Sequence, residues 1–232
     1  MLLTDSRAFP AEPPADLDSP EAITAHDQSV FDATATMKNH WDRAGWSEER
    51  RALYWFLTFP DDSALIGTAR ACQEGLDGLG LDLVPADGLH VTVARVGESV
   101  DTSPEVLAEL VRRVRQRGLK SFEIAAHPLA GSQGAVRFTL TPWRPLVALH
   151  AALAACGREA GVTGGRQTSS FRPHLSIAYN PSVRPAQPII DQVSRLREIQ
   201  PVPLEITGVD LVELRREARE YRWEVLHRLE LQ

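Results

Sequence analysis

Two short motifs with the same chemistry constrain this chain most: residues 90–93 (His-Val-Thr-Val) and residues 174–177 (His-Leu-Ser-Ile). Each contains a histidine, a spacer, a hydroxyl residue and an aliphatic residue, and each lies in a run of β-forming residues. Side chains alternate across a strand, so the histidine and the hydroxyl share one face and the other two side chains share the opposite face. The repeat therefore predicts two strands that each separate a reactive face from a packing face.

The segments around these motifs predict an α+β domain with two similar halves. Apolar periodicity and turn residues give the order strand, helix, motif strand, helix, hairpin, helix, motif strand, helix, hairpin. The predicted segments are Ala52–Phe59, Leu65–Leu76, Leu89–Val96, Pro104–Arg117, Phe122–Ala126, Ala135–Leu140, Pro145–Cys156, Phe171–Tyr179, Ile189–Leu196, Leu204–Leu214 and Tyr221–Leu231. Because each half contributes one motif strand, we expect the two histidines to face a shared cleft near a pseudo-two-fold axis.

The first fifty residues differ in composition from the rest of the chain. Residues 1–28 combine four prolines with scattered acids and few aliphatic residues. Such a composition buries too little apolar surface to offset the entropy of ordering it, so it predicts a disordered acidic tail. Residues 29–50 are expected to form a helical extension that carries Phe31, Met37, Trp41 and Trp46. The folded domain is then expected over residues 51–232.

Charge and composition exclude several classes of protein. The formal net charge is −6, and most of it comes from the first thirty residues, where six acids face one arginine. The nearly neutral remainder argues against a broad basic surface for long duplexes and favours a short or end-bound substrate. Without an apolar run of membrane-spanning length or a secretory signal pattern, we expect a cytoplasmic protein with no membrane contact. We also expect it to be a monomer. Cys72 and Cys156 are too isolated to indicate a disulfide framework or a zinc site.

A pair of histidines on facing strands is suited to acid–base chemistry at phosphorus. Imidazole titrates near pKa ~6.5, so one ring can accept a proton while the other donates one. The hydroxyls of Thr92 and Ser176 can hydrogen-bond non-bridging phosphate oxygens, and the scheme requires no metal or cofactor. The other histidines show no ligand spacing, so no metal site is expected. The alternative is that His90 and His174 are ordinary core or surface residues of two strands.

The motif contexts carry a family resemblance. Residues 89–95 (Leu-His-Val-Thr-Val-Ala-Arg) and 171–179 (Phe-Arg-Pro-His-Leu-Ser-Ile-Ala-Tyr) resemble the 2H phosphoesterase superfamily, most closely its 2′-5′ RNA ligase-like branch. The resemblance extends over about residues 52–231 and leaves the first fifty residues outside. It implies a bilobal α+β fold, in which two antiparallel sheets with outer helices surround a central cleft.

The same resemblance implies an activity. It is metal-independent hydrolysis, or reverse ligation, of 2′,5′-linked or 2′,3′-cyclic phosphates. The implied partners are RNA ends, 2′,5′-oligonucleotides or small cyclic-phosphate nucleotides. The implied catalytic set is His90, Thr92, His174 and Ser176, with serine where threonine is also common in the family.

Several other side chains are candidates for substrate binding. Strand parity places Arg172 on the face of His174, where its guanidinium would reach a phosphate. Four aromatic residues are candidate stacking surfaces for a base: Tyr54, Phe56, Trp143 and Tyr179. Two alternatives stay open, namely a binding protein that keeps the cleft without turnover and an esterase for phosphate esters other than RNA.

Overall fold

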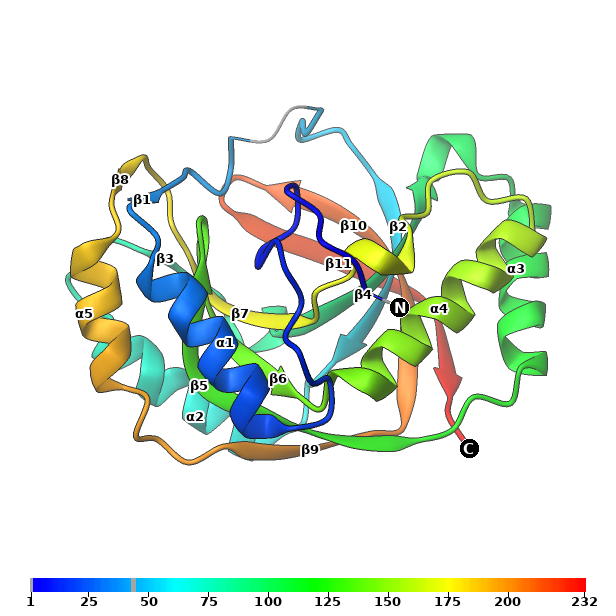
Figure 1. Ribbon diagram of the computed structural model, residues 1–232. Coiled ribbons are helices and arrows are strands. Elements are labelled where there is room, and N and C mark those ends of the chain that lie inside the picture. Colours follow the sequence, from blue (N-terminus) through cyan, green and yellow to red (C-terminus); the bar gives the residue numbers. More distant parts are fainter. Residues whose placement is uncertain (1, 43–44) are drawn as a thin grey trace.

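Two antiparallel sheets form the frame of the molecule (Figure 1). The computed structural model describes residues 2–42 and 45–232. Its strands are β1 (Thr36–Met37), β2 (Ala52–Thr58), β3 (Asp82–Leu83), β4 (His90–Glu98), β5 (Phe122–Ser132), β6 (Ala135–Thr141), β7 (His174–Tyr179), β8 (Arg184–Pro185), β9 (Val202–Ile206), β10 (Gly208–Glu217) and β11 (Glu220–Glu230). One sheet has the order β11-β10-β2-β4, the other has β3-β7-β6-β5-β9, and β1 pairs with β8 alone. The predicted α+β class with two antiparallel sheets is confirmed.

Five helices in the described part of the chain cover these sheets. They are α1 (Pro20–Asp32), α2 (Ser63–Gly75), α3 (Pro104–Gln116), α4 (Trp143–Glu159) and α5 (Gln187–Arg195). Helix α4 packs on β4 and is flanked by α3, whereas α2 packs on β7 and β9 and α5 packs on β5. Local sequence explains where α2 begins, because the side chain of Asp62 caps it by accepting a hydrogen bond from the Leu65 amide at 2.9 Å. None of these helices is both long and apolar enough to cross a membrane.

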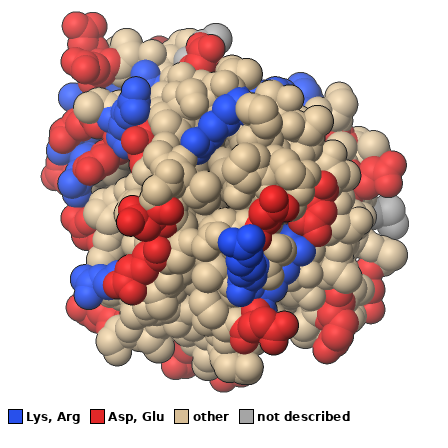
Figure 2. All heavy atoms as spheres, turned by 90° about the vertical axis from the view of Figure 1, so that its left-hand side faces the viewer, with Lys and Arg blue, Asp and Glu red and all other residues tan. Residues whose placement is uncertain are grey.

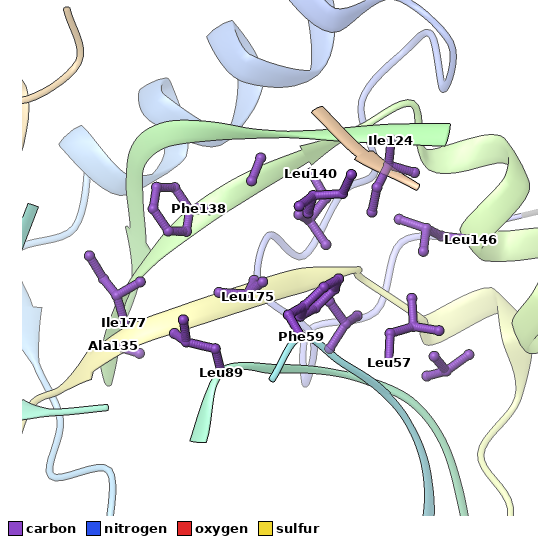
Figure 3. Packing of buried hydrophobic residues seen from close by; sticks show 14 of the residues in the cluster. Leu57, Phe59, Leu89, Ile124, Ala135, Phe138, Leu140, Leu146, Leu175 and Ile177 are labelled. Atoms are coloured by element: carbon purple, nitrogen blue, oxygen red, sulfur yellow. The ribbon is translucent and has the colours of Figure 1, made fainter. Parts of the chain in front are cut away.

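The two motif strands show the alternation that their sequences predict. Val91, Val93, Leu175 and Ile177 are at most 1% exposed and belong to the main hydrophobic core. Figure 3 shows Leu175 in this core, in a buried layer with Leu89. The histidines lie on the opposite faces, where His90 and His174 are half-buried. Each motif strand thus anchors one face in the core and presents the other to the region where the chemistry is expected.

The prediction of the last hairpin is wrong for its first strand. The segment predicted as one strand over 204–214 is divided at Thr207, where the chain passes from one sheet to the other. Strand β9 pairs with β5 in the five-stranded sheet, and β10 pairs with β2 and β11 in the four-stranded sheet. Both strands contain β-forming residues, so local pattern alone gave no sign that their pairing partners differ.

The first fifty residues, called the leading segment below, also differ from prediction. Helix α1 begins at Pro20, inside the stretch 1–28 that was predicted to be a disordered tail. Ser19 caps α1 by accepting from the Ala22 amide at 3.1 Å, and Pro20 stands at its first position. Ile23, Asp27 and Phe31 share one face and are fully buried. This face was missed because an aspartate lies at its centre, which weakens the apolar pattern. The helix expected within 29–50 ends at residue 32 and is followed by β1, while residues 1, 43 and 44 of the predicted segments lie outside the described residues.

Candidate active site

The two motif histidines are oriented by the same local contact. His90 Nδ1 lies 2.8 Å from the carbonyl oxygen of Gly88, and His174 Nδ1 lies 2.8 Å from that of Arg172. A carbonyl oxygen only accepts, so in each ring Nδ1 carries the hydrogen and donates it. In the neutral ring this leaves Nε2 as the basic nitrogen, the atom that exchanges protons. In both motifs the acceptor is the residue two positions before the histidine, so the repeat in sequence is also a repeat in geometry.

The motif hydroxyls accompany the histidines on two neighbouring strands. Strands β4 and β7 come from different sheets and lie against each other. Thr92 is half-buried and Ser176 is 8% exposed. Within residues 2–42 and 45–232, neither hydroxyl is engaged in a hydrogen bond to another protein group. Their hydrogen-bonding capacity therefore remains for a bound ligand.

An aromatic wall lies beside His90. The ring of Phe56 stacks on the imidazole with centroids 4.4 Å apart, and Trp223 meets it edge-on at 5.1 Å. Burial in this environment lowers the pKa of His90 to about 4, although the hydrogen bond to Gly88 acts in the opposite direction. His90 is therefore neutral at pH 7. Trp223 was missed by the sequence reasoning, because its place beside His90 depends on how β11 pairs with β10 and not on any local motif.

Polar partners of the second motif lie on the adjacent strand β6. In the antiparallel pairing, Thr139 stands opposite His174 and Arg137 stands opposite Ser176, so these side chains share one face of the sheet. Arg137 and Thr139 are each 2% exposed, and both donate hydrogen bonds to the carboxylate of Asp27 in α1, at 3.2 and 2.9 Å. Helix α1 therefore covers the sheet immediately beside the second motif. Sequence reasoning missed Arg137 because it read β6 only as part of a hairpin.

Comparison with known families assigns the chain. A family model described as the 2′-5′ RNA ligase superfamily matches residues 58–218, a range that contains both motifs. The chain belongs to the 2′-5′ RNA ligase superfamily. Membership in this superfamily supports an enzyme with phosphoesterase-type activity. No curated protein is matched by the sequence.

Solved structures share the fold of this superfamily member at low sequence identity. LigT of E. coli has a TM-score of 0.60 and 18% identity, over 79% of this chain and 99% of LigT. TT0787 of Thermus thermophilus has a TM-score of 0.57 and 18% identity, over 78% of this chain and 97% of its own. The MHV ns2 PDE domain has a TM-score of 0.50 and 17% identity, over 70% and 97%. These similarities show a 2H phosphoesterase fold.

The proposed phosphate contact of Arg172 does not fit its surroundings in this superfamily member. Arg172 is 5% exposed, and each of its five N–H donors is directed at a backbone carbonyl. The acceptors are Pro10, Ser169, Phe171, Leu3 and Ala11, at distances between 2.7 and 3.2 Å. The guanidinium thus anchors the leading segment, and no donor remains for a phosphate. Arg172 precedes β7, which begins at His174, and strand parity gave no information about residues at the far end of the chain.

The four aromatic candidates divide into two groups. Tyr54 and Phe56 lie on the His90 side, with ring centroids 5.9 Å apart. Trp143 is wholly buried in the main core and offers no surface to a base, which corrects its prediction. Tyr179 is 6% exposed and stacks on His40 at 4.0 Å, so a base would have to displace a protein contact to reach it. No group of three or more His, Cys, Asp or Glu in the described residues is arranged to hold a metal ion.

The depressed pKa of His90 predicts a measurable titration. We expect His90 to stay neutral in the folded protein until the pH falls to about 4. Unfolded histidine takes up its proton near pH ~6.5, so the contribution of His90 to stability is present above that value and is lost as the pH falls towards 4. Histidine ring NMR signals followed against pH measure the midpoint directly. Phe56→Leu should move the midpoint upward, and a wild-type midpoint equal to that of unfolded histidine would contradict the assignment.

Proposed function

We propose that this protein is a metal-independent phosphodiesterase that hydrolyses 2′,3′-cyclic or 2′,5′-linked phosphates of RNA ends or small nucleotides. The observation that carries the proposal is the matched orientation of His90 and His174. Each ring donates from Nδ1 to a carbonyl two residues earlier, which assigns Nε2 to proton transfer in both. Each histidine is accompanied by a hydroxyl on the same strand face, a pairing that two unrelated surface histidines would show only by coincidence.

The pKa of His90 supports a division of labour between the two rings. Because burial keeps His90 neutral at pH 7, it is assigned as the general base that takes a proton from water. The water oxygen then bonds to phosphorus while the bond from phosphorus to the leaving ribose oxygen breaks. His174 gives that oxygen a proton, and Thr92 and Ser176 hydrogen-bond the non-bridging oxygens as charge develops. The products from a 2′,3′-cyclic phosphate are one phosphomonoester and one free hydroxyl.

The neighbouring structures and the surface charge support small or terminal substrates. Crystal structures of E. coli LigT hold 3′-AMP, ATP and NADP+, which are all nucleotides. Figure 2 shows basic and acidic side chains interspersed on one face of the molecule, without a continuous basic patch. This face therefore provides no track of positive charge of the kind that binds long nucleic acid by phosphate neutralisation. A short substrate that is held by the site itself is consistent with both observations.

The deciding experiment is incubation of the purified protein with a substrate panel. The panel contains 2′,3′-cyclic mononucleotides, 2′,5′-linked dinucleotides and RNA with a cyclic-phosphate end, and products are identified by mass spectrometry. We expect conversion to phosphomonoesters, with the same rate in excess EDTA as without it. Binding of these compounds with no product over hours would contradict the proposal and favour a binding protein. Loss of activity in EDTA would favour a metal-dependent hydrolase.

A further inference from the structure

Helix α1 brings a carboxylate to the sheet face that carries the second motif. Asp27 is fully buried, and its two carboxylate oxygens accept from Arg137 at 3.2 Å and from the hydroxyl of Thr139 at 2.9 Å. In the pairing of β6 with β7, Thr139 stands opposite His174 and Arg137 stands opposite Ser176. Side chains opposite each other in an antiparallel pair have Cβ atoms roughly 5 Å apart. The Asp27 carboxylate is therefore linked to the neighbourhood of His174 through one side chain, that of Thr139.

The packing of α1 fixes the position of this carboxylate. The helix lies on β5 and β6, as Figure 1 shows, and Phe31, one turn after Asp27, is fully buried. A Cβ added to Gly131 of β5 would come within 2.3 Å of the Phe31 ring, so the helix fits this strand only where the strand has no side chain. The family model matches residues 58–218 and does not include α1. Asp27 is thus a feature of this chain that lies outside the matched family region.

Asp27 compensates a positive charge beside the second motif. Arg137 is 2% exposed, and its Nε has no hydrogen-bond partner among the described residues. Its other hydrogen bonds are to Asp27 and to the carbonyl of Phe9 at 3.3 Å. Within residues 2–42 and 45–232, Asp27 is the one carboxylate that forms an ion pair with this guanidinium. Because a nearby positive charge disfavours a protonated imidazole, the ion pair bears directly on whether His174 can hold a proton.

We propose that Asp27 is a positioning residue of the active site, which neutralises Arg137 beside the second motif and so keeps His174 able to carry a proton at neutral pH. The inference rests on the proposed function, in which His174 is the general acid. It gives the two histidines different environments, because aromatic rings enclose His90 whereas a compensated ion pair stands on the strand beside His174. Different environments of this kind are how two similar groups take the roles of acid and base.

The other charged and titratable groups around the second motif belong to the leading segment, to β3, to β4 and to the residues before β7. They are Asp5, Glu12, His26, Asp82, His90 and Arg172. Arg172 donates to backbone carbonyls, Asp5 pairs with Arg7 at 3.1 Å, and Asp82 stands opposite Tyr179 at the far end of β7. All six groups are the same in the variants proposed next, so a change in the titration of His174 reports on the ion pair alone.

The titration of His174 tests the inference without requiring turnover. Its ring NMR signals are assigned by their absence from His174→Asn, and in the wild-type chain their midpoint should lie at or above about pH 6, close to that of free histidine. Asp27→Asn keeps an oxygen acceptor for Thr139 but removes the negative charge, which makes the protonated ring less favourable. The midpoint should therefore fall by about one pH unit, the scale of a unit charge at roughly 7 Å inside a protein.

A matched control separates the charge of Asp27 from the loss of an ion pair in general. Asp32→Asn is the same substitution in the same helix and breaks a pair with Arg197 on the surface, where the aspartate is 40% exposed, so it should leave the midpoint of His174 unchanged. Asp27→Leu combined with Arg137→Met removes both buried charges and should return the midpoint close to that of wild type. An unchanged midpoint in folded Asp27→Asn overturns the inference. If that variant does not fold in a thermal melt, a wild-type midpoint below about pH 6 overturns it and a higher one supports it.

The pH dependence of kcat distinguishes this effect from a loss of structure. Asp27→Asn should move the alkaline limb of the profile, which reports the acid His174, to lower pH by about the same amount and leave the acidic limb of His90 in place. A purely structural role would lower kcat at every pH and move neither limb. Absence of product from the wild-type chain would contradict the proposed function, whereas the effect of Asp27 on His174 is decided by the titration.

Discussion

Replacing either motif histidine with asparagine lowers kcat/KM for a 2′,3′-cyclic nucleotide by at least ~10²-fold, the contribution expected from a positioned general acid or base. Asparagine is chosen because its amide N–H can replace Nδ1–H as the donor to the carbonyl of Gly88 or Arg172. The substitution therefore preserves the local hydrogen bond while it removes the titrating nitrogen. Initial rates measured with purified wild-type, His90→Asn and His174→Asn proteins test the prediction.

The control for this prediction is a histidine outside the site. His227→Asn in β11 changes a half-buried ring on a strand that also carries Trp223, yet it should leave kcat/KM within a few-fold of wild type. Because the two motif histidines act on one reaction, the double variant should be only slightly slower than the slower single variant. Near-wild-type activity in either single variant would show that its histidine does not transfer the proton.

Replacing Asp27 with alanine destabilises the fold by about 3–5 kcal/mol, the cost of leaving a buried charge without its partner. Asp27 is fully buried and Arg137 is 2% exposed, so water cannot replace the lost carboxylate. The hydroxyl of Thr139 loses its acceptor at the same time. The free energy of unfolding from urea titration measures the effect. This is the largest stability change that we expect from any single substitution in the leading segment.

Two companion variants show whether burial is the cause. Asp18→Ala removes an ion pair with Arg144 whose side chains are 50% and 67% exposed, so its loss should cost less than about 1 kcal/mol. Asp27→Leu combined with Arg137→Met removes both buried charges and should recover much of the stability that Asp27→Ala loses. If Asp27→Ala and Asp18→Ala have the same effect, α1 is not docked on the sheet in solution.

Much of the fold could be predicted from the sequence, because strand alternation and helix capping depend only on neighbouring residues. The motif strands β4 and β7 begin with alternating polar and apolar residues. Helix α2 begins after the capping residue Asp62, and its buried residues recur at helical spacing. These features arise from backbone geometry within a few residues, so they survive without knowledge of the partner segments. Local signals place the ends of elements less accurately: α4 was predicted to begin at Pro145 but begins at Trp143.

The errors share one cause, which is dependence on distant residues. The division of segment 202–217 between two sheets follows from pairing with β5 and β2, which both lie far earlier along the chain. Arg172 was predicted to bind phosphate, whereas its guanidinium donates to backbone carbonyls of the leading segment. The same segment looked disordered because one side of its helix is stabilised by Arg137, and no window of sequence around Asp27 contains that partner.

By itself, the sequence determined the α+β class and the two motif strands, each with one face buried in the core. It did so because strand alternation is a local property with a period of two residues. Only the tertiary structure decided which groups surround each histidine ring. It packed Phe56 and Trp223 against His90, which lowers the pKa of that ring. It also surrounded the Arg172 guanidinium with backbone carbonyls of the first eleven residues. Burial and hydrogen-bond saturation depend on groups brought together from distant parts of the chain, so they were fixed only by folding.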